Sequence, residues 1–438
     1  MKEKIVNLIA DHVEGMTAEE IATFIEIPPK QELGDYAFPC FRLAKTMHKA
    51  PNLIAADIKE AIGDVDFLDK IDVQGAYLNF FVKKDIFVQT MIEAALKDNF
   101  GGSDEGADKV ICIDYSSPNV AKNFHVGHLR TTIIGNSLYK IYSKLGYKVI
   151  RINHLGDWGT QFGKLIVAYK NWGTKEAVEK DGVAELMRLY VKFHEEADKN
   201  PELVDEARAW FSKMEHGDEE ALSIWQWFKD ISLVEYKRTY DLLGMDFDYY
   251  LGESFYRDKC QDVVDQLTNA NLLKESEGAM IVDLSDYDMA PCIVTKKDGS
   301  SIYATRDLAA IFYRKNTYHF TKCLYVTGQE QKLHFAQVFK VVELLGNDWA
   351  KDSLVHIPYG LVSLEGAKLS TRSGNIIYAE DILHDAIKKS FEIISEKSPN
   401  LPDKEEVAKI VGVGSVLFND LYNQRIKDVS FSWDKVLN

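Results

Sequence analysis

The pattern that most constrains the fold is a strand, a helix and a second strand in the middle of the chain. Residues 110–115 form a continuous apolar run, 127–145 follow a helical pattern that Gly146 ends, and 147–153 form a second apolar run. Two strands joined through a helix make a βαβ unit. Continuous rather than alternating apolar strands favour a parallel sheet covered on both faces. The alternation of strand and helix resumes at 323–327, 332–345 and 354–358. We therefore expect a doubly wound α/β fold.

The length of 438 residues exceeds one ordinary core, so two to three domains are expected. Residues 1–103 alternate helical patterns with short strand-like runs and predict a smaller α+β domain that closes on a turn-like linker at 99–103. The strand-like runs are 70–73 and 76–82. Residues 104–400 contain the α/β pattern, interrupted at about 165–235 by an acid-rich helical insertion. Residues 401–438 read as a helical junction.

Charge and apolar content exclude several classes of protein. With 52 Lys and Arg against 68 Asp and Glu, the net charge is −16, which disfavours binding of duplex nucleic acid through general charge but allows a local basic groove. No apolar run approaches the roughly 18 residues of a membrane span, and the N-terminus does not read as a targeting signal. The cysteines are scattered and lack ligand spacing, which predicts buried reduced thiols in a cytoplasmic protein: Cys40, Cys112, Cys260, Cys292, Cys323.

The loop between the first predicted strand and its helix contains the densest chemistry. Lys122, His125 and His128 lie within seven residues of one another, and Gly127 lets a ligand approach the backbone. A loop at the carboxyl end of a parallel strand is where such sheets bind ligands, and the helix N-terminus offers N–H groups to an anion. The sequence has neither a P-loop nor a GxGxxG pattern, so the histidines are candidate donors to phosphate oxygens. The alternative is two ordinary histidines that cap a buried helix.

A second cationic loop lies at 366–375, with glycines at both ends and hydroxyls between the charges. Lys368, Ser370 and Arg372 are the candidates for contacts with phosphate in this loop. Taken alone, such a loop is more often ordinary solvated surface than a ligand site. Together with an upstream HxGH pattern, it favours a polyphosphate ligand.

These two segments resemble a known family. HVGH at 125–128 and KLSTR at 368–372 resemble the HIGH and KMSKS signatures of class I aminoacyl-tRNA synthetases. The runs SSPNVAKNFHVGHLRTTIIGNSL at 116–138 and NHLGDWGTQFG at 153–163 closely resemble the arginyl-tRNA synthetase family. The resemblance covers essentially the whole chain. It implies a Rossmann-like catalytic domain with a helical insertion, preceded by a domain that binds the core of tRNA.

The resemblance also implies a reaction and its partners. Arginine and ATP would give arginyl-adenylate and pyrophosphate, and arginine would then pass to the 3′-terminal ribose of tRNA-Arg. ATP would bring Mg²⁺ as its companion, with no metal bound tightly by the protein. A monomer is expected. Members of this family continue past 430–433 into a helical anticodon-binding domain, so the resemblance suggests a fragment with poor activity on tRNA.

Residue roles follow from the resemblance. His125, His128 and Lys122 would stabilise the transition state, with Lys122 replacing the cation that KMSKS has where this chain has Thr371. Lys368, Ser370 and Arg372 would hold pyrophosphate. The residues implied at the ATP site are Gly127, Gly156, Asp157, His334 and Lys368.

A guanidinium ligand calls for carboxylates in a fork arrangement, which would reject lysine. The residues implied around arginine are Asn119, His154, Glu253, Tyr303, Asp307 and Gln331. Asp307 is also consistent with a surface pair with Arg306 or Arg314. Asn79 corresponds to a tRNA contact of the family, although an edge strand with aromatic residues is equally consistent with core.

Two rival functions remain open at the level of sequence. One is another HxGH nucleotidyltransferase, which would not need paired acids for a guanidinium group. The other is a non-catalytic tRNA-binding module. Retention of the cations and imidazoles in both loops favours the enzyme, because a binding module has no need for that charge pattern.

Overall fold

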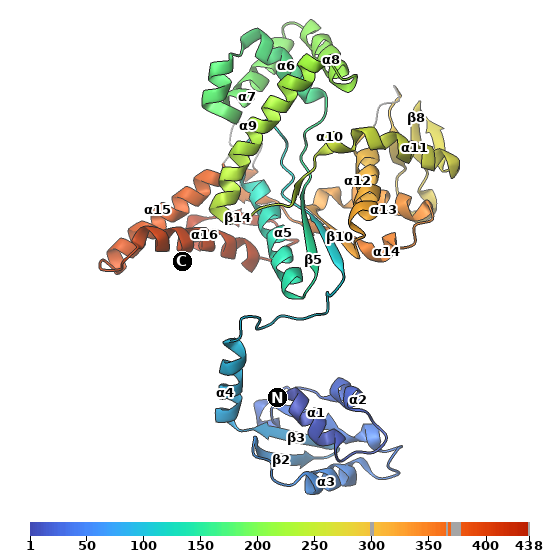
Figure 1. The fold of residues 1–438 in the computed structure, drawn as a ribbon, viewed down its shortest axis with the longest axis vertical. Helices are drawn as coiled ribbons and strands as arrows, with labels where there is room; N and C mark the ends of the chain where they lie inside the picture. Colours follow the sequence, from blue (N-terminus) through green and yellow to red (C-terminus); the bar gives the residue numbers. More distant parts are fainter. Residues whose placement is uncertain (298–301, 365–366, 369–377, 437–438) are drawn as a thin grey trace. The chain divides into compact units, whose positions relative to one another are not determined.

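A computed structural model describes residues 1–297, 302–364, 367–368 and 378–436. The chain divides into two units, Met1–Gly102 and Ser103–Asn438, each with its own sheets and buried core (Figure 1).

The first unit contains an antiparallel sheet of three strands in the order β1-β3-β2. The strands are β1 (Tyr36–Pro39), β2 (Leu68–Gln74) and β3 (Tyr77–Val82). Gly75, at φ 62°, makes the tight turn between β2 and β3. Because β3 is the central strand, the sequence interpretation of an edge strand around Asn79 is wrong. The helices are α1 (Lys2–Ala10), α2 (Ala18–Phe24), α3 (Pro51–Ile62) and α4 (Lys84–Ala95).

The second unit is built around a sheet of five parallel strands in the order β11-β10-β4-β5-β6. From β4 the chain moves outward through β5 and β6 in one direction, and from β10 through β11 in the other. The order therefore reverses between β4 and β10, which is where sheets of this kind bind ligands. The strands are β4 (Val110–Asp114), β5 (Lys148–Asn153), β6 (Tyr249–Tyr250), β10 (Lys322–Gly328) and β11 (Leu354–Tyr359).

Side chains of β4 alternate between two buried clusters, so helices cover both faces of the sheet. Ile111 and Ile113 join the cluster that includes residues of α5 (Val126–Lys144), α15 (Ala379–Lys397) and α16 (Lys404–Tyr422). Cys112 joins the cluster on the other face. The helices that contribute to that second cluster are α11 (Cys260–Asn269), α12 (Tyr303–Tyr318), α13 (Lys332–Leu344) and α14 (Ala350–Ser353). This arrangement confirms the predicted doubly wound α/β fold.

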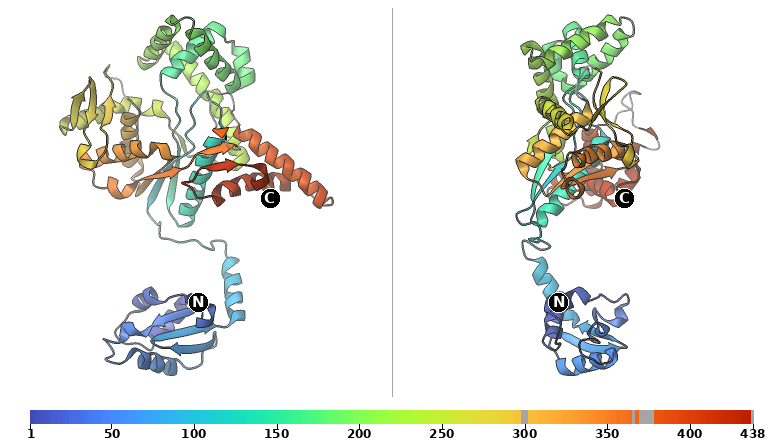
Figure 2. Two further views of the ribbon diagram at one scale, coloured as in Figure 1. Left: turned by 180° about the vertical axis from the view of Figure 1, so that it is seen from behind. Right: turned by 90° about the vertical axis from the view of Figure 1, so that its right-hand side faces the viewer.

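The helical insertion lies between β5 and β6 and gathers at one end of its unit (Figure 2, green). Its helices reach further than the sequence interpretation of about 165–235, because α6 begins at Thr160 and α9 ends at Leu243. Trp158, Phe162 and Phe228 belong to a buried cluster of its own. The helices are α6 (Thr160–Trp172), α7 (Lys175–Ala197), α8 (Glu202–Glu215) and α9 (Glu219–Leu243).

Two smaller sheets complete the second unit. One is an antiparallel sheet of β7 (Leu273–Ser276), β8 (Ala279–Val282) and β9 (Cys292–Thr295), which no pattern in the sequence indicated. In the other sheet, β14 (Val429–Phe431) pairs in parallel with β12 (Val362–Leu364). Residues 429–431 therefore belong to the same unit as the five parallel strands. The remaining α-helices and strands of the described residues are α10 (Glu253–Tyr256), β13 (Ala367–Lys368) and α17 (Trp433–Val436).

Two further observations bear on function. All five cysteines are buried thiols. Within the described part of the chain, no helix has both the length and the apolar character needed to cross a bilayer.

Candidate active site

The two histidines of the HVGH motif form the N-terminus of α5. His125 is the N-cap, and its Nδ1 accepts a hydrogen bond from the N–H of Gly127 at 3.1 Å. The Nδ1 of His128 accepts one from the N–H of His125 at 3.3 Å. The rings stack with centroids 3.9 Å apart. Because each Nδ1 is an acceptor, these hydrogen bonds assign the proton of each neutral ring to Nε2, which can donate to a ligand.

Electrostatics keep this pair neutral. Burial, followed by the charge of Lys122, lowers the pKa of His125. Burial, with His125 and Lys122, lowers the pKa of His128 well below its usual value. Lys122 is half-buried, and burial lowers the pKa of its ammonium group. Two neutral imidazoles beside an ammonium group form a site that favours an anion.

The loop that precedes the histidines is folded tightly against the loop that follows β5. The N–H of Val120 donates to the carbonyl of Gly156 at 3.0 Å, and the N–H of Gly156 donates to the carbonyl of Pro118 at 3.1 Å. A Cβ at Gly156 would lie 2.1 Å from Oδ1 of Asn119, so the two loops approach too closely for a larger residue. The loops that follow β4 and β5 are therefore held directly against one another.

A cavity of about 300 Å³ opens at the reversal point of the sheet. It is lined by segments that follow β4, β10 and β11. Five predicted site residues lie together in its wall: Asn119, His125, Gly127, His128 and Gln331. Its volume and its several convergent polar groups match those of a small-molecule site.

The predicted arginine-binding acids both have a basic side chain as a neighbour. Nε of Arg306 lies 3.2 Å from Oε2 of Glu253, and Nε2 of His334 lies 2.6 Å from Oδ2 of Asp307. The guanidinium of Arg306 also lies over the ring of Tyr303, 5.1 Å from its centroid. The expected alternative, a surface pair of Asp307 with Arg306 or Arg314, is not what the structure contains.

The carboxyl of Glu253 is electrostatically unusual. Burial raises its pKa to about 8, with Arg306 opposing the shift and with Asp307 and Asp157 adding to it. The influence of Asp307 means that the two acids lie within electrostatic reach of one another. His334 lies one turn after the cavity residue Gln331 at the start of α13, but neither His334 nor the two acids are among the residues that line the cavity.

His154 and Asp157, predicted to lie near the substrates, have protein partners. Nδ1 of His154 lies 3.1 Å from Nη2 of Arg314, which is fully buried and also lies 2.8 Å from Oδ2 of Asp114. The carboxylate of Asp157 lies 2.6 Å from Nζ of Lys229 and accepts from the hydroxyl and the N–H of Ser254. These contacts join β4, α12 and the insertion, and a substrate contact for either residue stays a prediction.

Three other predicted residues belong to the cationic loop at 366–375, and one belongs to the first unit. Ser370 and Arg372 lie outside the described residues, and Lys368 is described only as part of β13. Asn79 is 4% exposed in the central strand of the first unit, so its tRNA contact also stays a prediction.

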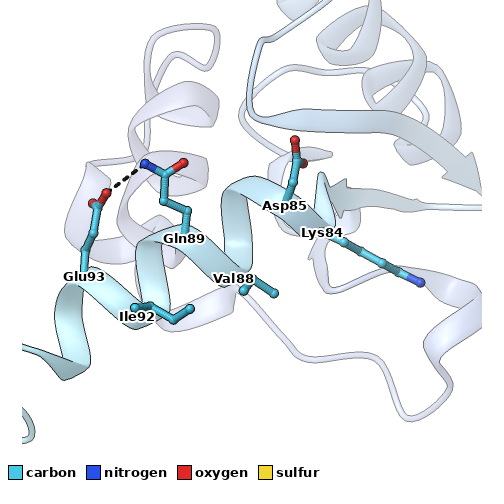
Figure 3. Close-up of a pocket in the computed structure, with 6 residues that line it drawn as sticks. All are labelled: Lys84, Asp85, Val88, Gln89, Ile92 and Glu93. Carbon is cyan, nitrogen blue, oxygen red and sulfur yellow. Dashed lines mark hydrogen bonds between the residues drawn. The ribbon is translucent and has the colours of Figure 1, made fainter.

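A larger hollow, about 510 Å³, lies along α4 in the first unit (Figure 3). It is lined by six side chains of this one helix, among which Nε2 of Gln89 donates to Glu93 at 2.8 Å. Groups from a single helix face do not converge on a ligand, so the smaller cavity between β4 and β10 is the better candidate site.

Sequence reasoning missed three buried hydroxyls of α9 that contact the loop before the histidines: Ser232, Tyr236 and Tyr240. A signal was present, because polar residues spaced four apart share one helix face. The acidic residues of the same helix suggested only a solvated surface.

Comparison with known proteins identifies relatives over the whole chain. A family model described as tRNA synthetases class I (R), catalytic domain, matches residues 90–433, and one described as Arginyl tRNA synthetase N terminal domain matches residues 2–82. Curated proteins named arginine–tRNA ligase are 57% identical over 99% of this chain in Alkaliphilus metalliredigens and 55% identical over 100% in Clostridioides difficile. The chain spans 77% of each of these relatives.

Solved structures agree at the level of fold. An arginyl-tRNA synthetase from Thermus thermophilus matches with a TM-score of 0.75 at 22% identity, covering 100% of this chain and 78% of the other. One from Plasmodium falciparum matches with a TM-score of 0.72 at 22% identity, covering 100% and 77%.

Proposed function

Because this chain belongs to the arginyl-tRNA synthetase family, we propose that the cavity between β4 and β10 is where it joins arginine to AMP for transfer to tRNA. One observation supports this location above others. The stacked pair His125 and His128, whose Nδ1 atoms both accept hydrogen bonds, lines a cavity at the reversal point of a parallel sheet. An oxygen of the arginine carboxylate attacks the α-phosphorus of ATP, and the bond to the bridging oxygen breaks to release pyrophosphate.

The chemical difficulty is charge, because a carboxylate attacks a polyphosphate. His125 and His128 would donate to phosphate oxygens, and Lys122 would supply the cation that Thr371 does not. Gly127 would leave room for the nucleotide, and Lys368, Ser370 and Arg372 would hold the departing pyrophosphate. No side-chain nucleophile is needed, so catalysis consists of alignment and charge neutralisation.

Arginine would be recognised at both of its ends. Asn119 and Gln331, which line the cavity, would hold the α-amino and carboxylate groups. Glu253 and Asp307 would receive the guanidinium, beside Tyr303. The ammonium group of a lysine substrate would not match two carboxylates as a planar guanidinium does, which is the proposed physical basis for its rejection.

The proposal includes Mg²⁺ bound to ATP. The described residues contain no cluster of three or more His, Cys, Asp or Glu side chains that could hold a metal ion. Mg²⁺ usually binds through substrate phosphates and water in such sites, which supplies charge neutralisation there. The five buried thiols suit a reducing compartment and support a cytoplasmic location. The expected monomer stays a prediction.

The proposed function is tested by pyrophosphate exchange into ATP with arginine, lysine or glutamate as the amino acid, with and without tRNA-Arg. Exchange that depends on arginine is expected. Exchange driven equally by lysine or glutamate would indicate a different nucleotidyltransferase, and binding of tRNA without exchange under any condition would indicate a non-catalytic module.

A further inference from the structure

Three hydroxyl side chains on α9 form a row against the loop that contains the proposed catalytic lysine. Ser232, Tyr236 and Tyr240 are spaced four residues apart, so they share one face of the helix. Their exposed fractions are 0%, 0% and 1%, although hydroxyl-bearing residues normally keep access to water. These three residues are the α9 hydroxyl row.

Each member of the α9 hydroxyl row contacts a different point of the loop at 116–122. Oγ of Ser232 accepts from the N–H of Ala121 at 2.9 Å. The hydroxyl oxygen of Tyr236 lies 2.7 Å from the carbonyl oxygens of both Asn119 and Lys122. The hydroxyl of Tyr240 lies 2.7 Å from Oγ of Ser116 and accepts from Nδ2 of Asn153 at 2.9 Å.

The loop needs such support because its backbone is strained. Ser116, Ser117 and Ala121 have φ values of 70°, 47° and 58°, in the left-handed region that residues other than glycine seldom occupy. Such conformations persist only where surrounding contacts hold them, and they cluster at functional sites. Ala121 lies between Asn119 and Lys122, so its backbone conformation sets the directions of both side chains.

Tyr236 is the member that holds both ends of this turn. One hydroxyl in contact with two carbonyls keeps residues 119 and 122 at a fixed separation. Burial raises the pKa of the Tyr236 phenol, so the group stays protonated and able to donate. Its ring packs beside Phe124, with centroids 5.8 Å apart, so a phenylalanine would keep the packing and remove only the hydroxyl.

We propose that Tyr236 is a positioning residue for adenylate formation, which it serves through the placement of Asn119 and Lys122. It does not line the cavity and contacts the backbone of these residues rather than a substrate. The inference rests on the proposed function. It also gives the helical insertion a role, since α9 belongs to the insertion and the loop belongs to the sheet.

The test combines Tyr236→Phe with Lys122→Ala in arginine-dependent pyrophosphate exchange, measured with tRNA-Arg present. Misplacement of a reacting group by about 1 Å costs on the order of 100-fold, so Tyr236→Phe is expected to lower kcat by at least about tenfold. In the Lys122→Ala background the same change is expected to lower kcat by a clearly smaller factor, because only the placement of Asn119 remains to be lost.

Tyr169→Phe is the matched control. Tyr169 is a half-buried tyrosine of the same insertion, its ring packs against Phe228 of α9, and no catalytic role is assigned to it. Its exchange rate and that of the unaltered chain should agree, and thermal unfolding of all variants gives the folded fraction.

The outcomes separate this inference from the proposed function. Absence of arginine-dependent exchange in the unaltered chain would overturn both. Exchange in the unaltered chain with equal losses from Tyr236→Phe in the two backgrounds, or with no loss beyond Tyr169→Phe, would overturn this inference alone. A loss explained entirely by the folded fraction would also overturn it.

Discussion

At the scale of single residues, the arginine-binding role proposed for Glu253 predicts that arginine affinity depends on pH. Its pKa of about 8 in the ligand-free protein means that it is mostly protonated below that pH. A guanidinium ligand needs the carboxylate, so binding should release a proton, and affinity should rise by up to about tenfold per pH unit from 6 to 8 and then level off.

Calorimetric titration with arginine in buffers of different ionisation enthalpy measures this proton directly. Glu253→Gln should bind weakly and without the pH dependence. Proton uptake on binding, or an affinity that is constant between pH 6 and 8, would contradict the role given to Glu253.

Lys122 provides a second test at this scale. Lys122→Ala should slow arginine-dependent pyrophosphate exchange by about 100-fold or more, since it removes a cation from a reaction governed by charge. Arginine binding should stay nearly intact, because the recognition of arginine is assigned to other residues. Lys140→Ala, an exposed position further along α5, is the control. A loss of only a few-fold would refute the role.

Without the family resemblance, which indicated Gln331, the site residues could be predicted from sequence only where they lie close together in the chain. The loop at 116–128 was recognisable because its cations, imidazoles and glycine are local. The contact of Glu253 with Arg306 and that of Asp307 with His334 were not recognisable, because each joins residues of different helices. A sequence pattern does not indicate which of several basic side chains contacts a given acidic side chain.

At the scale of elements, the packing of α5 on β4 depends on a missing side chain. A Cβ at Gly135 would lie 2.2 Å from Cγ of Tyr115, so helix and strand meet more closely than alanine allows. Gly135→Ala should destabilise the second unit by about 1–3 kcal/mol through overpacking.

Gly414→Ala on α16 is the matched control for that change. No atom lies within 4 Å of the Cβ it would add, and the position is exposed. This change should stabilise by up to about 1 kcal/mol, because glycine is a poor helix former. Midpoints of urea unfolding compare the two variants, and equal shifts of the same sign would contradict the packing described for α5.

The strands of the parallel sheet and the helices that cover it were predictable because their apolar periodicity is strong. The ends of the insertion and the sheet of β7 to β9 were not predictable. Residues 160–164 and 236–243 mix polar and apolar side chains, because parts of both segments pack against the parallel sheet of the second unit and its loops. Strands β7, β8 and β9 have four residues each, too few to show a clear period.

At the scale of the whole molecule, the two units have separate cores and should unfold separately. Phe38 is fully buried in the cluster of the first unit, with no member of that cluster beyond Val82. Phe38→Ala should cost about 3–5 kcal/mol in that unit and leave the second unchanged. Differential scanning calorimetry should show two transitions, of which only one moves. A single transition that shifts as a whole would indicate that the units unfold as one.

The placement of the cysteines gives each unit a natural chemical reporter. Cys40 is the one cysteine in the first unit, and the other four belong to a single cluster in the second. A thiol-alkylating reagent can reach none of them until a core opens, since the most exposed has 6% of its surface accessible. The rate at which each gains mass from such a reagent therefore measures how often its own unit opens under native conditions, without any label being introduced.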